Sequence, residues 1–275
     1  MAVGQARGQG RGLRIYAVLY LAFLYAPIVL LPVFAFNDST IIAFPLSGFT
    51  TQWFVELADV PALHSAVLTS LKIAVVTALI STLLGICAAR AATRYRFPAK
   101  GGIMGVIMLP LVLPEIIVAV SLLVVFLQIG LELSSLTVIL GHVLICTPFC
   151  IAILNGSFQS LDVSLEEAAV DLGESGWGAF RLVILPLVMP GIIASLLIAF
   201  TISMDEFIIA FFLSGSDPTL PVYLWGQLRF PQRLPVVMAL GTILVVASVL
   251  IIILAEWFRR RGVAKRGGSD SGGFL

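Results

Sequence analysis

The sequence predicts an all-α membrane protein with six transmembrane helices and both termini in the cytoplasm. The first observation is its composition: 60% of the 275 residues are hydrophobic, only 11% are charged, and the mean hydropathy is +1.10. A soluble domain of this length could not bury so much apolar surface, so we expect the bilayer to be its solvent. The second observation is the length of the apolar runs, and the third is the alternation of charge between them.

Six apolar runs are long enough to cross the hydrocarbon core of a bilayer, which requires about 20 helical residues. They lie at 15–36, 66–89, 103–127, 136–154, 187–213 and 235–257. The first run follows several arginines, as the apolar core of a signal peptide would. It is too long for a signal peptide, and the bulky Phe34-Ala35-Phe36 is not a small-x-small cleavage site. We therefore expect an uncleaved first span.

Basic residues set the orientation. They gather before the first run, between the second and third runs, and after the sixth, at Arg7, Arg11, Arg14, Arg90, Arg94, Arg96, Lys100, Arg259, Arg260, Arg261, Lys265 and Arg266. The alternate connections carry mostly acids, with Arg229 and Arg233 as exceptions. The positive-inside rule then places both termini in the cytoplasm. We expect a basic tail at 1–14, a transmembrane domain at 15–257 and a tail at 258–275 that is disordered.

The most acidic stretch, LEEAAVDLGESGWGAFRLVILPLVMPG at 165–191, lies between the fourth and fifth runs, on the predicted cytoplasmic side. Ser164 and Glu167 have the spacing of a capping box at the start of a helix. Gly173 can adopt the left-handed conformation that ends a helix, and Ser175 can cap a second one. Pro186 then marks the entry to the fifth span.

The first of these short helices is predicted to be amphipathic. Its apolar stripe is Leu165, Ala168, Ala169 and Leu172, and its polar stripe is Glu167, Asp171 and Glu174. Two small alanines side by side allow another protein surface to approach closely. The alternative interpretation is a solvated connecting helix that lies on the membrane.

The same stretch resembles the EAA motif of ABC-importer permeases, which reads EAA-x3-G-x9-I-x-LP. Here it runs from Glu167-Ala168-Ala169 through Gly173 to Leu185-Pro186, with Val183 in place of the isoleucine. The resemblance implies a type I ABC-importer permease fold and a coupling helix at about 164–181 that sits in a groove of an ATPase subunit. The coupling residues that follow from it are Glu166, Glu167, Ala168, Ala169, Asp171 and Gly173.

The resemblance also implies the partners. They are a second permease subunit, two ATPase subunits and an extracytoplasmic solute-binding protein, assembled at the bacterial inner membrane. A homodimer of this chain is the alternative to a second, different permease. The sequence contains no G-x-x-x-x-G-K-[ST] motif, so ATP and Mg²⁺ are expected on the ATPase subunits and no cofactor or metal on this chain. The chain is thus predicted to be a transport subunit, not an enzyme.

Three acids lie inside predicted spans: Glu115, Asp205 and Glu206. A carboxylate in hydrocarbon costs roughly 2.5–3.5 kcal/mol on insertion scales, so each should face the bundle interior, a water-filled path or a cation. Pro110 and Pro114 precede Glu115, and they are expected to kink the span and free backbone carbonyls. Carbonyls and a carboxylate together suit a cation. The alternative is that these acids bond to neighbouring helices.

A narrower resemblance concerns the solute. "LPLVLPEII", "SMDEFIIAFFLSG" and "TLPVYLWGQLR" resemble the spermidine/putrescine permease subfamily, although Glu206 stands where that subfamily often has a second aspartate. The resemblance implies uptake of polyamines by alternating access, along a path of Glu115, Asp205 and Glu206. On one continuous helix Asp205 and Glu206 would point about 100° apart. We expect the solute to meet Asp205 first and Glu115 next, near mid-membrane.

Other interpretations remain as alternatives. The chain could serve an ABC importer for another small solute, or act as an ion-coupled secondary transporter. An intramembrane serine protease would use the G-x-S-G at 173–176, but it needs a histidine on a later span, and His64 and His142 both come earlier. His142 is predicted to be a hydrogen-bonded helix contact. The cysteines, Cys87, Cys146 and Cys150, are predicted to be small core residues.

Overall fold

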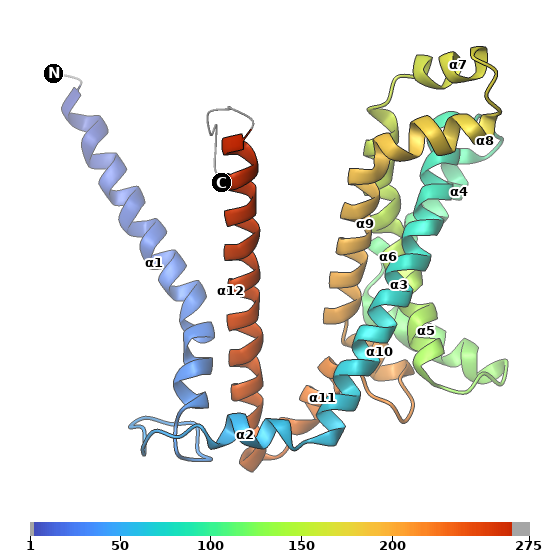
Figure 1. Cartoon of the computed structure of the whole chain (residues 1–275). Helices are drawn as coiled ribbons and strands as arrows, with labels where there is room; N and C mark the ends of the chain where they lie inside the picture. Colours follow the sequence, from blue (N-terminus) through green and yellow to red (C-terminus); the bar gives the residue numbers. More distant parts are fainter. Residues whose placement is uncertain (1–2, 266–275) are drawn as a thin grey trace. The chain divides into compact units, whose positions relative to one another are not determined.

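The computed structural model describes residues 3–265, and these are helical apart from loops and one isolated bridge between Asn37 and Phe49. The chain divides into two compact units, shown in Figure 1. The first combines residues 1–60 with residues 227–275, and the second is Pro61–Gly226. The all-α prediction is confirmed.

The first unit pairs the first and last long helices. α1 (Val3–Ala35) packs against α12 (Leu234–Lys265), which also contacts the short α2 (Gln52–Ala58) and follows the 3-10 turn η3 (Pro231–Arg233). A buried Asn37 organises the loop after α1, because its carbonyl oxygen accepts from the Trp53 indole at 2.8 Å and its side chain accepts from the Ser47 amide at 3.0 Å.

The long helices extend beyond the predicted spans. Residues 258–265, for which we expected disorder, continue α12, and α1 already begins at Val3 within the expected basic tail. The expected disorder from Gly267 onward lies outside the described residues. Apolar side chains of α1 point outward, with Phe23 80% exposed, so this helix requires apolar surroundings beyond its own unit.

The core of the second unit is formed by α3 (Pro61–Arg94), α6 (Ser135–Gln159) and α9 (Leu185–Asp205), which pack on one another. Small residues allow close approach of the backbones, as is usual between membrane helices. A Cβ atom on Gly85 of α3 would lie only 2.8 Å from the Cβ atom of Cys150 on α6. Cys146 and Cys150 are wholly buried in this core, as predicted, whereas Cys87 is exposed.

The third predicted span is not one straight helix. α4 (Lys100–Met108) and the 3-10 turn η1 (Leu109–Leu111) form one arm, and α5 (Glu115–Gln128) forms a second arm bent from it by 102°. Pro114 is extended, at φ −58° and ψ 128°, and it precedes α5 directly. The expected kink is therefore confirmed, and it is large enough to divide the segment in two.

The fifth predicted span also differs from expectation. No loop separates α8 (Gly176–Ala179) from α9: the chain passes through one π-helical turn, η2 (Phe180–Ile184), into α9, and Pro186 lies in the first turn of α9. It stops at Asp205, and Glu206 is extended at φ −69° and ψ 119° before α10 (Ile208–Leu213). The prediction of one helix through 187–213 was wrong.

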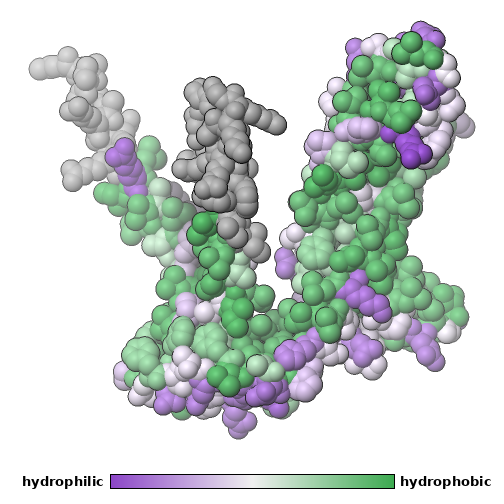
Figure 2. Space-filling view, viewed as in Figure 1, coloured by the Kyte–Doolittle hydropathy of each residue, from purple (hydrophilic) through white to green (hydrophobic). Residues whose placement is uncertain are grey.

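Among the described residues, five helices are long and apolar enough to cross a membrane, and the bent pair makes six if it counts as one span. Figure 2 shows apolar residues over most of the visible face of the second unit, with hydrophilic residues gathered near its two ends. This distribution is the one expected for a protein surrounded by lipid tails and bounded by two aqueous phases.

The packing of α10 generates a first prediction. A Cβ atom on Gly141 of α6 would lie 2.5 Å from Ile209 Cγ2 and 3.0 Å from Leu213 Cδ1 of α10. Gly141→Ala should therefore push α10 away and destabilise the protein by about 1–3 kcal/mol, as overpacking does. The measurement is the midpoint of thermal unfolding in detergent. Gly156→Ala on the same helix is the control, because its Cβ atom would meet open space; equal midpoints for the two variants would contradict the packing argument.

Candidate functional site

The acidic connection between α6 and α9 forms two short helices, α7 (Ser164–Asp171) and then α8. The predicted capping box of Ser164 and Glu167 is not formed. Instead the Ser164 backbone amide donates to Asp162 Oδ1 at 3.0 Å. This bond, together with the Ser164 hydroxyl and with Arg94 at longer range, lowers the pKa of Asp162 from its ordinary value. Asp162 thus replaces Ser164 as the residue whose side chain accepts at the start of α7.

The end of α7 is as predicted. Gly173 has φ +95°, the Gly173 amide donates to the Val170 carbonyl oxygen, and the Glu174 amide donates to the Ala169 carbonyl oxygen. These two bonds form a Schellman motif, which requires the left-handed conformation that glycine adopts without strain. Ser175 caps α8 by accepting from the Gly178 amide at 3.0 Å, as expected. The chain direction therefore changes sharply between α7 and α8.

The two predicted stripes of α7 are distributed differently in the structure. Ala169 alone of the apolar stripe is buried, while Leu165, Ala168 and Leu172 are exposed, and Leu172 is 87% exposed. The exposed set also includes Glu167 and Asp171. The outward surface of α7 is therefore a mixture of small, apolar and acidic side chains, which suits contact with another protein surface.

Glu166 points inward toward α3. Its carboxylate lies 2.5 Å from Arg90 Nη2 and 3.7 Å from Arg94 Nε, and all three side chains are mostly buried. The Arg90 guanidinium also lies 4.7 Å from the ring centroid of Phe180, within the range of a cation–π contact. Sequence reasoning missed this cluster, because two arginines four residues apart at the end of a span are explained by topology alone.

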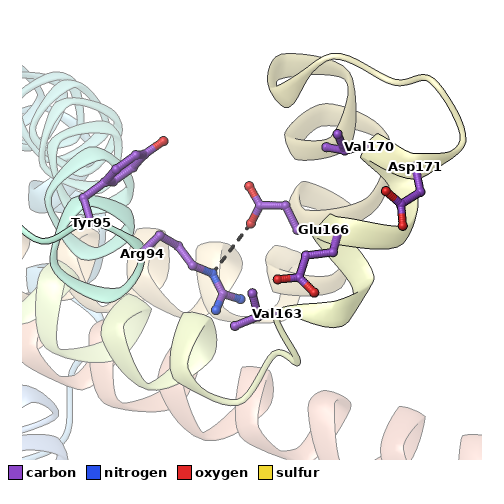
Figure 3. A pocket seen from close by; sticks show the side chains of 7 residues that line it. Arg94, Tyr95, Val163, Glu166, Val170 and Asp171 are labelled. Atoms are coloured by element: carbon purple, nitrogen blue, oxygen red, sulfur yellow. Dashed lines mark ion pairs between the residues drawn. The ribbon is translucent and has the colours of Figure 1, made fainter.

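A cavity of about 370 Å³ separates the end of α3 from α7. Figure 3 shows Arg94 and Tyr95 on one side of it and the side chains of α7 on the other, with the ion pair between Arg94 and Glu166 across it. Its lining is Arg94, Tyr95, Val163, Glu166, Glu167, Val170 and Asp171. Because Glu166 is paired with arginine, Glu167 and Asp171 are the acids of this cavity without an ion pair among the described residues.

The three membrane acids occupy different environments. Glu206 is buried, and both of its carboxylate oxygens accept from the Ile209 amide, at 3.1 and 3.2 Å. Its Oε2 lies 4.0 Å from Nε2 of His142, whose Nδ1 lies 2.7 Å from Ser203 Oγ. His142 is thus a buried helix contact, as predicted. Because Glu206 stands outside any helix, the predicted angle of 100° between it and Asp205 does not apply.

The other two acids are exposed. Asp205 is the last residue of α9, and Glu115 is the first residue of α5. A carboxylate in the first turn of a helix interacts favourably with the free amide groups and the dipole there. All three acids therefore lie at helix breaks, where backbone groups are also free of the regular helical pattern. Whether they line one path stays a prediction.

Apolar helices long enough to cross a membrane, a pair of short helices between α6 and α9, and acids at helix breaks are together typical of the membrane subunit of a transporter. The family described as "Binding-protein-dependent transport system inner membrane component" matches residues 81–262. The chain belongs to this family and is the permease subunit of an ABC importer, a transport component rather than an enzyme.

Individual relatives support the same assignment. The chain is 36% identical over 240 residues to the spermidine/putrescine transport system permease protein PotC of Escherichia coli K12, covering 87% of this chain and 90% of PotC. It is 36% identical over 249 residues to the putrescine transport system permease protein PotI of the same organism, covering 88% of each. A crystal structure of a bacterial alginate ABC transporter, in complex with an alginate pentasaccharide-bound periplasmic protein, has the same fold. The TM-score is 0.71 at 19% identity, over 94% of this chain and 96% of that one.

The geometry of Gly173 generates a second prediction. Gly173→Val places a β-branched residue at φ +95°, where it is strained, so the Schellman motif should be lost and α7 should be displaced from α8. Solute uptake should fall strongly while the amount of protein in the membrane stays normal. Gly176→Val is the matched control, because its Cβ atom faces open space. Wild-type uptake in the Gly173 variant would remove the turn from the transport mechanism.

Proposed function

We propose that this chain is a transmembrane subunit of an ATP-driven importer that takes up polyamines, such as spermidine and putrescine, by alternating access. The observation that carries the solute class is the placement of Glu115, Asp205 and Glu206 at breaks in two membrane segments. Carboxylates at such positions, beside free backbone groups, favour a solute with several amines. The names of PotC and PotI, to which the chain is similar over most of its length, point the same way.

The exposed surface of α7 is proposed to contact an ATPase subunit. Glu167, Ala168 and Leu172 point outward there, and the Gly173 turn fixes their direction relative to α8. ATP and Mg²⁺ would be bound by two ATPase subunits, with Glu166, Ala169 and Asp171 supporting the contact from this chain. The further partners are a second, different permease subunit and an extracytoplasmic solute-binding protein. We place the assembly in the bacterial inner membrane.

Along the proposed path the solute meets the acids in a fixed order, Asp205 first and Glu115 next. Asp205 ends α9, whereas Glu206 turns inward to the Ile209 amide, so Asp205 is the acid of this pair that is free to meet the solute. Glu115 begins α5 with its side chain exposed and is proposed as the next contact. An ABC importer for another small solute is the alternative within the same class.

The solute path gives a third prediction. Asp205→Asn and Glu115→Gln remove a negative charge at nearly constant size, so uptake of labelled spermidine or putrescine should fall about tenfold or more if about 1.4 kcal/mol of cation stabilisation is lost. The measurement is uptake in a strain that lacks its own polyamine importers, with assembly of the complex monitored in parallel. Glu132→Gln, in the loop between α5 and α6, is the control. Unchanged uptake in both path variants would assign these acids to helix packing and leave the solute open.

A fourth prediction concerns orientation. If both termini are cytoplasmic, the loops at Gly48 and Ser216 face the opposite side of the membrane. Single cysteines at these positions, in a chain without Cys87, should react with a membrane-impermeant thiol reagent added from outside the cell. The buried Cys146 and Cys150 should stay unlabelled. Labelling of either loop only after the membrane is opened would reverse the orientation.

A further inference from the structure

Two arginines at one end of α3 join three separate segments of the second unit. Arg90 pairs with Glu166 of α7 and lies over the Phe180 ring, at the start of the π-helical turn that leads into α9. Arg94 also pairs with Glu166, and its Nη2 donates to the Leu161 carbonyl oxygen at 3.2 Å, in the turn after α6. Arg90 and Arg94 are four residues apart and so share one face of α3.

This cluster, which we call the Arg90–Arg94–Glu166 clamp, differs from an ordinary surface ion pair. The exposed fractions of its side chains are 15% for Arg90, 12% for Arg94 and 22% for Glu166, so water and salt screen it weakly. The Arg90 guanidinium contacts two groups at once, the Glu166 carboxylate through Nη2 and the Phe180 ring through its face, which the compact ammonium of a lysine would not do. Removal of Glu166 would leave the two mostly buried positive charges of Arg90 and Arg94 without their acidic partner.

The neighbouring acids of α7 do not share this arrangement. Glu167, the first residue of the EAA motif, is exposed and has no ion pair within the part of the chain that the structure describes, and the same holds for Asp171. Successive residues of a helix point about 100° apart, so Glu166 and Glu167 necessarily face different surroundings. One acid is therefore available to a partner, and the other holds α7 to its own chain.

We propose that the Arg90–Arg94–Glu166 clamp transmits movement of α7 directly to α3, in parallel with the covalent connection through α8 to α9. Arg90, Arg94 and Glu166 are positioning residues in this view, because they touch neither the solute nor ATP. When α7 is displaced, the clamp moves α3 and α9 together, so ATP hydrolysis in a partner is matched by solute movement. The inference rests on the proposed function only in assuming that an ATPase subunit is what displaces α7.

The test is the ratio of ATP hydrolysed to solute taken up by the complete importer in proteoliposomes with its binding protein. Arg90→Gln and Glu166→Gln should each raise this ratio about fivefold or more, the lower end of typical coupling between sites. Because both act on one contact, the double variant should raise it no further than the single ones. A purely structural role would instead lower the amount of assembled complex at an unchanged ratio. Arg96→Gln, an exposed arginine two residues beyond Arg94, is the matched control.

A milder variant keeps the proposal testable if Arg90→Gln does not assemble. Arg90→Lys retains the positive charge but loses the planar guanidinium and its contact with the Phe180 ring, so it should give an intermediate ratio. Ratios equal to the wild type in Arg90→Lys and Glu166→Gln, or additive effects in the double variant, would overturn the clamp.

A second measurement separates failure of the clamp from failure of the proposed function. Spin labels at Leu84 of α3 and Leu165 of α7, both exposed, report the distance between the two helices in the purified complex without Cys87. The distance distribution should broaden in Arg90→Gln and stay narrow in Arg96→Gln. Equal distributions would overturn the clamp. A wild-type complex that takes up solute without ATP hydrolysis would instead contradict the proposed function, while the distances still decide whether the clamp holds α7.

Discussion

The whole architecture depends on one constraint: backbone amide and carbonyl groups in apolar surroundings must find hydrogen-bond partners. A helix provides these partners everywhere except in its first and last turns. Each break in a membrane segment therefore needs another group to bond the free backbone amides and carbonyls. At the break between α9 and α10 the partner is the Glu206 carboxylate, which accepts from the Ile209 amide in the first turn of α10. At the start of α5, Glu115 stands in the first turn, beside amides that lack helical partners. Acids and breaks therefore occur together, and this places charge inside the membrane domain without isolating it.

Features set by local chemistry could be predicted from the sequence. The apolar runs, the left-handed Gly173, the Ser175 cap and the kink before Glu115 each follow from a few neighbouring residues. The break after Asp205 could not, because "SMDEF" contains neither proline nor glycine. It depends on the Glu206 carboxylate bonding forward to the Ile209 amide beside the buried His142, which is 64 positions earlier in the chain. The predicted cap at the start of α7 was wrong because Asp162 and Ser164 can both cap a helix, and their spacing alone does not choose between them.

In the candidate site, too, the features set by neighbouring residues could be predicted and those set by distant contacts could not. The EAA spacing indicated the connection between α6 and α9, which forms a short helix with Glu167 and Ala168 exposed; that this surface meets a partner stays a prediction. The role of Glu166 was hidden, because adjacent glutamates look equivalent in a sequence while a helix sends them to different neighbours. The pairing of Arg90 and Arg94 with Glu166 could not be predicted for another reason. A basic cluster at the end of a span is explained by topology alone, and its pairing with an acid 76 positions later becomes visible only in the folded chain.

The helical segment from Gly176 to Asp205 connects the acidic connection around α7 with the break that carries Asp205 and Glu206. Figure 1 shows α8 bent from α9, and the 21 residues of α9 alone correspond to about 32 Å at 1.5 Å per residue, enough to cross the hydrocarbon core of a bilayer. A displacement at α8 therefore reaches Asp205 along one helical segment. That segment is irregular at the π-helical turn of Phe180–Ile184 and at Pro186 and Pro190, whose nitrogens cannot donate a hydrogen bond. That turn begins at the ring on which Arg90 lies. The contact that ties α7 to α3 thus also braces the π-helical turn, which is one of the places where this segment departs from regular helix, so a small change there should alter coupling more than it alters folding.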